Sequence, residues 1–555
     1  MASELDRNYD RVNAQVTGPG GMLAVGKDAL GQSIVTNFPA TLPGLVREFS
    51  KLNAEHEAIV AGDERLKFPD VDALSERLAR ALVARGIEQG DRVGIAMRNC
   101  PSWVVAYFAI LKAGGIATLL NGWWESNELA HALSLVRPKL IIADPSRAQR
   151  IASACSNCAV VALPIELPVE QALAELLDAD DPVIVLPHVK PEDDATILFT
   201  SGSTGEAKGA VSTHRAVTTA TYAYATGLIT MLGLLTEEGR APPSKPRVLL
   251  SVPLFHVTGE VPVMLNSFVV GRCLVMMPKW DAGEALRLIE QEKVSYFVGV
   301  PTMSLELMTH PDHDKYDVSS LTDIAAGGAP RPVSHVERLQ KTFPNAQPAL
   351  GYGLTETNAV GAHNFWSNYA AKPGSTGRAH TPFVKLAILG AGDAHLPPNE
   401  TGEIGIRTAA NIRCYWNAPE ATAALFTSDH YVRTGDIGYL DDDGYLFIVD
   451  RKKEIIIRGG ENIASAEVEA ACYAFPGVAE ASVFGAPDER LGEVPVAVIL
   501  ATTPGSLSVD DLRAFLTQRL ARFKVPERFI LVDEELPKLG TGKIDRRALK
   551  TRFAR

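Results

Sequence analysis

A short stretch rich in serine, threonine and glycine has the composition of a loop that binds phosphate groups. It reads LFTSGSTGEAKG, from Leu198 to Gly209. Small hydroxyl residues beside glycines let several backbone N–H groups face one anion without obstruction, and Lys208 adds a positive charge. The apolar run Ala195–Phe199 predicts a buried strand, so we expect the loop where a sheet strand ends, a usual place for ligands in α/β folds.

Two other interpretations of this stretch fit less well. A serine-glycine surface linker would not be so short, follow a strand directly and be closed by a lysine. The triphosphatase loop G-x-x-x-x-G-K-[ST] differs in spacing: counted from Gly202, Ala207 stands where glycine is needed, and Gly209 follows the lysine in place of Ser or Thr. The sequence therefore indicates a phosphate loop of another kind.

Two further clusters carry residue types suited to a nucleotide and an acid. SVPLFHVTG (251–259) is a strand-like run that contains His256, with Glu260 beside it. AAGGAP (325–330) and GYGLTET (351–357) offer glycines for close approach of a flat ligand, Tyr352 to stack on a purine and Glu356 as a hard oxygen for Mg²⁺. Taken alone, His256 also fits a packed core histidine, and the glycine stretches fit a turn and a strand end.

Charged residues gather toward the C-terminal end. Residues 431–463 predict strands at Tyr445–Val449 and Glu454–Ile457 around a charged turn, Asp450–Lys453. Near the end, the glycines that flank Thr541 place Lys543 on a mobile loop, from which it could reach an anion on another domain. Solvated surface charge is the ordinary alternative for both.

The elements that position these residues alternate between helix and strand. A parallel sheet flanked by helices is predicted by the helix Val71–Arg85, the strand Val93–Met97, the amphipathic helix Val104–Lys112 and the strand Ile141–Ala143. Residues 232–246, polar with three prolines, are interpreted as an exposed insertion. From Arg451 onward a smaller domain is expected, with helices at Ala466–Ala474 and Val509–Leu520 and strands at Val478–Phe484, Val494–Leu500 and Arg528–Val532.

Composition restricts the class of protein. The chain has 555 residues, enough for more than one domain, and its 46% hydrophobic and 22% charged residues are typical of soluble globular proteins. A net charge of -12 argues against binding nucleic acid, which needs clustered Lys and Arg. A polar N-terminus and the lack of an apolar run of spanning length predict a cytoplasmic protein with no transmembrane segment.

The six cysteines are too scattered for a disulfide framework, which fits a reducing cytosol. Cys155 and Cys158 form a CxxC, but no second pair or histidine cluster completes a zinc site and no redox-protein context surrounds it. We therefore expect structural or incidental cysteines.

In their order, these motifs resemble the adenylate-forming superfamily, which contains acyl-CoA synthetases, beetle luciferases and the adenylation domains of peptide synthetases. The resemblance covers nearly the whole chain. It implies an α/β fold with a large N-terminal domain of Rossmann-like sheets (1–450) and a small mobile α+β domain (451–555), with the hinge at about 451–453 and Lys453 at the hinge position.

The resemblance also implies roles for single residues. Lys543, Glu356 and Thr200 would be catalytic, Glu356 would bind Mg²⁺, His256 would border the acid, and Gly459 and Gly460 would line the CoA tunnel. Many relatives have an aromatic-proline pair where this chain has Ala464-Ser465-Ala466, a departure near that tunnel. ATP or AMP would be bound by Thr200, Ser201, Gly202, Ser203, Thr204, Gly205, Lys208, Gly328, Ala329, Tyr352, Gly353, Thr355, Asp436 and Arg451.

The implied activity is ATP-dependent acyl-CoA synthesis through an acyl adenylate, with ATP, Mg²⁺ and coenzyme A. Peptide-synthetase domains carry an acidic residue near the position of His256 to hold an amino group, so an amino acid is not expected here. A medium- or long-chain fatty acid is the predicted substrate. Aryl acids such as hydroxycinnamates or benzoates are left open, as are a luciferase-like oxygenase, an inactive nucleotide-binding scaffold and a homodimer.

Overall fold

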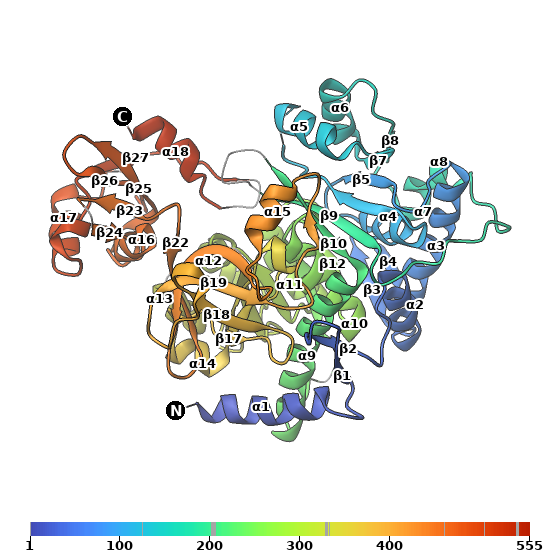
Figure 1. Cartoon of the computed structure of the whole chain (residues 1–555), viewed down its shortest axis with the longest axis horizontal. Coiled ribbons are helices and arrows are strands. Elements are labelled where there is room, and N and C mark those ends of the chain that lie inside the picture. Colours follow the sequence, from blue (N-terminus) through green and yellow to red (C-terminus); the bar gives the residue numbers. More distant parts are fainter. Residues whose placement is uncertain are drawn as a thin grey trace.

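The computed structural model describes residues 2–124, 126–200, 207–242, 244–327, 331, 333–459, 461–503, 505–539 and 543–554. Figure 1 shows a large body and, to one side of it, a smaller C-terminal part coloured red. This division agrees with the predicted α/β architecture of a large and a small part.

A first sheet of seven strands has the order β20-β10-β9-β6-β5-β7-β8. Its strands from β9 to β8 are parallel, whereas β10 pairs antiparallel with both β9 and β20. The segment 201–206 therefore joins two antiparallel strands, and Thr200 and Lys208 are paired at its base. The strands are β5 (Arg92–Ala96), β6 (Ile116–Leu119), β7 (Leu140–Ala143), β8 (Val160–Ala162), β9 (Asp194–Thr200), β10 (Lys208–Thr213) and β20 (Cys414–Tyr415).

A second sheet of nine strands has the order β17-β16-β15-β14-β13-β11-β12-β3-β4. Its six central strands are parallel and the edges are antiparallel. The strands are β3 (Glu57–Ala61), β4 (Glu64–Lys67), β11 (Arg247–Leu250), β12 (Cys273–Met276), β13 (Tyr296–Gly299), β14 (Asp323–Gly327), β15 (Gln347–Tyr352), β16 (Ala362–Phe365) and β17 (Arg378–Ala379).

The helices of the large body cover these sheets, and α4 is buried along its whole length. The prediction that the helix at Val104–Lys112 is amphipathic is therefore wrong. Even the Lys112 ammonium is buried, where it pairs with Asp72 at 2.5 Å. The helices are α1 (Glu4–Thr17), α2 (Leu42–Leu52), α3 (Phe68–Ala84), α4 (Pro101–Lys112), α5 (Ser126–Val136), α6 (Pro145–Ala154), α7 (Val169–Ala172), α8 (Ala174–Leu177), α9 (His214–Glu237), η1 (Gly259–Leu265), α10 (Asn266–Val270), α11 (Ala282–Glu292), α12 (Pro301–Thr309), η2 (His313–Lys315), α13 (Val333–Thr342), η3 (Thr355–Thr357), α14 (Trp366–Ala371), η4 (Ala391–Asp393) and α15 (Pro419–Leu425).

A third, four-stranded antiparallel sheet leads into the C-terminal part, which has a hydrophobic core of its own. The third sheet contains β18 (Lys385–Leu389), β19 (Gly402–Arg407), β21 (Val432–Leu440) and β22 (Leu446–Arg451), and a separate hairpin pairs β1 (Val25–Lys27) with β2 (Ser33–Val35). The C-terminal part contains β23 (Ile456–Arg458), β24 (Glu461–Ile463), α16 (Ser465–Tyr473), β25 (Val478–Asp488), β26 (Gly492–Ala501), α17 (Val509–Thr517), η5 (Arg522–Lys524), β27 (Arg528–Val532) and α18 (Arg546–Phe553).

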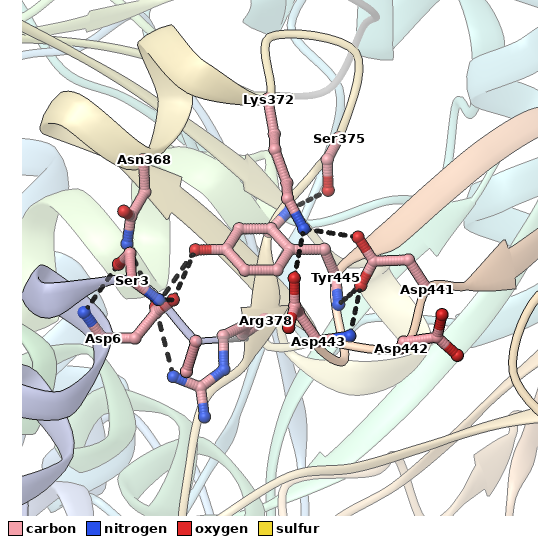
Figure 2. Close-up of polar contacts among 12 residues, drawn as sticks. Ser3, Asp6, Asn368, Lys372, Ser375, Arg378, Asp441, Asp442, Asp443 and Tyr445 are labelled. Carbon is pink, nitrogen blue, oxygen red and sulfur yellow. Dashed lines mark hydrogen bonds and ion pairs between the residues drawn. The ribbon is translucent and has the colours of Figure 1, made fainter.

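The N-terminal helix α1 is anchored by one buried carboxylate, that of Asp6. Figure 2 shows the side chains that converge on it: Asn368 donates at 3.0 Å, the Tyr445 hydroxyl at 3.0 Å, and Arg378 lies at 3.2 Å. Lys372 extends this network, because its ammonium lies 4.2 Å from the centre of the Tyr445 ring. A buried charge needs such partners, so this cluster ties α1 to α14, to β17 of the second sheet and to the residue before β22 of the third sheet.

Three further predictions need correction. SVPLFHVTG does not form a strand, because β11 ends at Leu250 and the motif turns into the π-helix η1. The stretch 232–246 is not an insertion throughout, because α9 continues to Glu237. For Cys155 and Cys158, expected to be structural or incidental, the structural alternative holds and the incidental one does not, because a disulfide joins them. Within the described part of the chain, none of the helices combines the length and apolar character that crossing a bilayer requires.

Candidate active site

The predicted ribose site is assembled from the ends of β15 and β22 and from the middle of β21. Asp436 lies on β21, opposite Arg451 in the pairing with β22, and Tyr352 ends β15 of the second sheet. The Tyr352 hydroxyl donates to Oδ2 of Asp436 at 2.7 Å, and Nε of Arg451 lies 3.1 Å from Oδ1. Burial raises the pKa of Asp436, and Arg451 and Tyr352 oppose that rise. The carboxylate, 3% exposed, is held by one cation and one hydroxyl.

Lys543 comes from the C-terminal part but lies at this same site. Burial and the nearby Arg451 lower the pKa of Lys543 to about 8, against the opposing charges of Asp436 and Glu454. The next residue, Ile544, forms an isolated β-bridge with Lys538. The lysine predicted to act on phosphates is therefore brought within electrostatic range of the predicted ribose carboxylate.

His256 also lies within electrostatic range of Lys543. Burial and the Lys543 charge lower the pKa of His256 to about 3, so the imidazole is neutral at physiological pH. Its Nδ1 accepts the backbone N–H of Thr258 at 3.3 Å, which places the ring proton on Nε2. His256 can thus donate a hydrogen bond, but it does not carry the charge of a general acid.

The predicted metal ligand Glu356 has a partner that the sequence did not reveal. The Tyr415 hydroxyl, on β20, donates to Oε1 of Glu356 at 2.6 Å. Lys208 Nζ lies 5.1 Å from the centre of the Tyr415 ring, over its face. Tyr415 therefore connects the end of the predicted phosphate loop with the predicted metal site. No local motif marks it, because it lies 59 residues from Glu356.

The described residues contain no cluster of three or more histidine, cysteine or acidic side chains that would form a metal cage. Glu356 alone still fits Mg²⁺, which protein sites often hold through one or two carboxylates together with substrate phosphates. At Glu356, the described side chains occupy only Oε1.

The remaining predicted site residues are distributed as follows. Gly353 needs to be glycine, because a Cβ there would lie 2.0 Å from the Ala359 carbonyl oxygen. Thr355 begins the short helix η3 that carries Glu356, and Thr200 ends β9. The predictions for Ser201, Gly202, Ser203, Thr204, Gly205, Gly328, Ala329 and Gly460 lie outside the described residues.

The predicted hinge is an exposed turn after β22. Glu454 and Ile455 both donate backbone N–H groups to the Arg451 carbonyl, at 2.9 and 3.2 Å. Lys453, between Arg451 and Glu454, is exposed. Gly459 has φ of 59° and donates to the Leu491 carbonyl at 2.7 Å. The tunnel role of Gly459 stays a prediction.

Ser465 makes a specific contact in the segment Ala464-Ser465-Ala466, where many relatives have an aromatic-proline pair. The Ser465 backbone N–H and hydroxyl both donate to the Asp450 carboxylate, the hydroxyl at 3.0 Å. A proline at this position would lack that N–H group. Asp450 thus joins the last strand of the large body to the first helix of the C-terminal part.

Comparison with known proteins agrees with this geometry. Residues 46–416 match the family model described as AMP-binding enzyme, and residues 467–543 match the AMP-binding enzyme C-terminal domain. A long-chain-fatty-acid–CoA ligase of Bacillus subtilis is 32% identical, with 93% of each chain covered. A feruloyl-CoA synthase of an Amycolatopsis species is 34% identical, with 91% of this chain and 97% of the relative covered.

A solved structure adds a bound nucleotide and ion to the comparison. The O-succinylbenzoate coenzyme A synthetase of Bacillus subtilis, in complex with ATP and a magnesium ion, has a TM-score of 0.76 at 26% identity, covering 91% of this chain and 99% of that one. Since the family model matches well over half of the sequence and the site residues converge in the structure, the chain belongs to the family of AMP-binding enzymes.

Proposed function

We propose that this enzyme joins a carboxylic acid to coenzyme A at the expense of ATP. In the first step the carboxylate attacks the α-phosphate of ATP, an acyl adenylate forms and pyrophosphate leaves. In the second step the thiol of coenzyme A attacks the acyl carbonyl and AMP leaves. The observation that carries the proposal is that Lys543 lies within electrostatic range of both Asp436 and His256.

Catalysis of the first step is mainly a matter of charge. A carboxylate is a weak nucleophile toward a polyanion, so the site must neutralise phosphate charge and orient the two reactants. Protonated Lys543 and Lys208 would face the phosphates, while Asp436 would accept hydrogen bonds from the ribose hydroxyls. Glu356 would hold Mg²⁺, which supplies further positive charge to the phosphates when bound.

For the acid, we propose a medium- or long-chain fatty acid. The motif around His256 is apolar, with Leu254, Phe255 and Val257 all buried. A neutral His256 suits a donor near the acid carboxylate rather than a proton acceptor, since the acid is already ionised at neutral pH. An aryl acid is the second candidate, supported by the feruloyl-CoA synthase relative.

The test is pyrophosphate release across a panel of fatty, aryl and short acids, each with and without coenzyme A. We expect release with at least one fatty or aryl acid, and a thioester by mass spectrometry only when coenzyme A is present. Adenylate that persists in the presence of coenzyme A, or oxygen uptake with light emission, would refute the ligase.

We further propose that residues 1–450 and 451–555 act as two domains joined at about 451–453. The exposed turn at Lys453 and the separate core of the C-terminal part support this division. Rotation there would exchange Lys543 for the segment around Gly459, which the second step would use for the pantetheine arm.

A further inference from the structure

Glu260 is a completely buried carboxyl group that the reaction above does not use. It lies in η1, directly after the motif that contains His256, and its side chain is 0% exposed. The Tyr107 hydroxyl donates to Oε1 at 2.7 Å. Among the described residues, Oε2 has no hydrogen-bond partner. Leaving such an oxygen unpaired in an apolar interior is unfavourable, so it calls for an explanation.

The position of Glu260 relates it to the acid. Its backbone N–H donates to the His256 carbonyl at 3.0 Å, which closes one helical turn. His256 is near Lys543, where the acid carboxylate must react. Glu260 therefore lies one helical turn beyond the residue that we propose borders the acid carboxylate.

Among the described residues, no counter-ion to Glu260 is found. Arg272, a buried cation near the end of η1, donates instead to the carbonyls of Pro262 and Val263 and to the Ser267 hydroxyl. Burial raises the pKa of Glu260 to about 7, with only the Tyr107 hydrogen bond opposing it.

The Tyr107 ring stacks on Trp103, with ring centres 5.4 Å apart, and the Trp103 indole N–H also lacks a partner among the described residues. The buried cluster of Trp103, Tyr107 and Glu260 thus contains one spare acceptor and one spare donor among the described residues. A π-helix such as η1 is a rare element that often occurs at functional sites.

We infer that Glu260 Oε2 accepts a hydrogen bond from a hydroxyl group of the acid substrate, remote from its carboxylate. The preferred acid would then have an apolar body and one hydroxyl, as an ω-hydroxy fatty acid or a hydroxycinnamate has. A hydroxyl group suits the site better than an ammonium group. Burying a cation costs a large desolvation free energy, and attraction to a single carboxyl group already shared with Tyr107 recovers less than that cost. This inference deepens the proposed function and rests on it.

The test compares matched acids with and without the hydroxyl. We would measure kcat/KM for thioester formation with an ω-hydroxy fatty acid against its parent, and with para-hydroxycinnamate against cinnamate. In the unmodified enzyme we expect at least one hydroxylated acid to be preferred by roughly tenfold to a hundredfold, the range for a hydrogen bond to a charged group.

Two substitutions at Glu260 and one control complete the design. Glu260→Leu should bring the hydroxylated-to-plain ratio close to one, and Glu260→Gln, which keeps an acceptor oxygen, should leave an intermediate ratio. Glu292→Gln removes another buried carboxylate, one that pairs with Arg65 and Arg247 instead of Tyr107, and should leave the ratio at its original value. Melting curves identify variants that fail to fold, and the glutamine variant serves if the leucine variant does not fold.

The outcomes separate the two proposals. Equal ratios in the unmodified enzyme and in Glu260→Leu would overturn the role of Glu260 while thioester formation still supported the ligase. Preference for an ω-amino acid over the hydroxy acid would overturn the hydroxyl assignment. Absence of pyrophosphate release with every acid would instead refute the proposed function.

Discussion

Replacing Tyr415 with phenylalanine would remove a single hydroxyl from the proposed metal site. That hydroxyl donates to Glu356 at 2.6 Å, and burial together with the Glu356 charge raises the pKa of Tyr415, so the group stays protonated and keeps donating. The aromatic ring, which faces Lys208, is retained in Tyr415→Phe. The substitution thus perturbs the orientation of Glu356 and little else.

Two effects of this change oppose each other. Without the donor, Glu356 holds more negative charge for a metal, but its carboxylate is no longer fixed. A hydrogen bond to a charged group contributes about 1.5–3 kcal/mol, and loss of the partner that orients a metal ligand typically costs about 10–100-fold in affinity or activity. The orienting effect is the larger, so we expect the apparent Mg²⁺ affinity to fall about tenfold or more.

The assay is pyrophosphate release against free Mg²⁺ at saturating ATP and acid. Tyr415→Leu is the comparison variant, because it also removes the ring that faces Lys208. Loss of this cation–π contact, which contributes about 0.5–2 kcal/mol, should then raise the KM for ATP. If Tyr415→Phe needs no more Mg²⁺ than the unmodified enzyme and keeps its rate, the assignment of Glu356 and Tyr415 to the metal site is wrong.

Three other predictions concern the lysines and the ribose site. Lys543→Ala should abolish adenylation yet still convert synthetic acyl adenylate to thioester, and an equal loss of both steps would contradict its role. Burial lowers the pKa of Lys543 to about 8 and the protonated form is needed, so kcat/KM for ATP should fall as pH rises above about 8. The residual rate of the Lys543→Ala variant should lack this fall. Asp436→Ala should raise the KM for ATP at least tenfold, since each charge-assisted bond to a ribose hydroxyl contributes about 1.5–3 kcal/mol, and an unchanged ATP dependence in a folded variant would remove it from the ribose site. Lys453→Pro fixes φ of this residue at about -65° and should keep pyrophosphate release in a first turnover while suppressing thioester formation. Parallel loss of both activities in single-turnover assays would argue against a hinge at Lys453.

Part of this arrangement could be predicted from the sequence because local patterns of apolar residues determine it. The apolar run before the phosphate loop forms β9, and the strand predicted at Arg528–Val532 is β27 with the same bounds. Convergence of Asp436 and Lys543 could be expected only through the resemblance, because no local property links residues that lie so far apart in the sequence.

Other features depend on contacts that periodicity does not encode. Tyr415 reaches Glu356 because β20 is added to the first sheet beside β10, a pairing of two residues with no pattern of its own. The burial of α4 was missed because Lys112 made it look amphipathic, whereas the lysine is paired inside. The stretch at His256 resembled a strand because a run of apolar residues is equally compatible with a buried helix.

The two steps of the proposed reaction make opposite demands on the contacts around the hinge. With Lys543 within electrostatic range of Asp436, the C-terminal part has the arrangement that we propose for adenylation. In it, the Asp450 carboxylate accepts both donors of Ser465 across the turn at Lys453. Asp450 belongs to β22 and Ser465 to α16, so a rotation at the turn would separate them. A ligand shifts such an equilibrium only by its differential affinity for the two arrangements. Departure of pyrophosphate removes the anion that favours Lys543 at the site, and we infer that this loss must outweigh the Asp450–Ser465 contact before coenzyme A can enter.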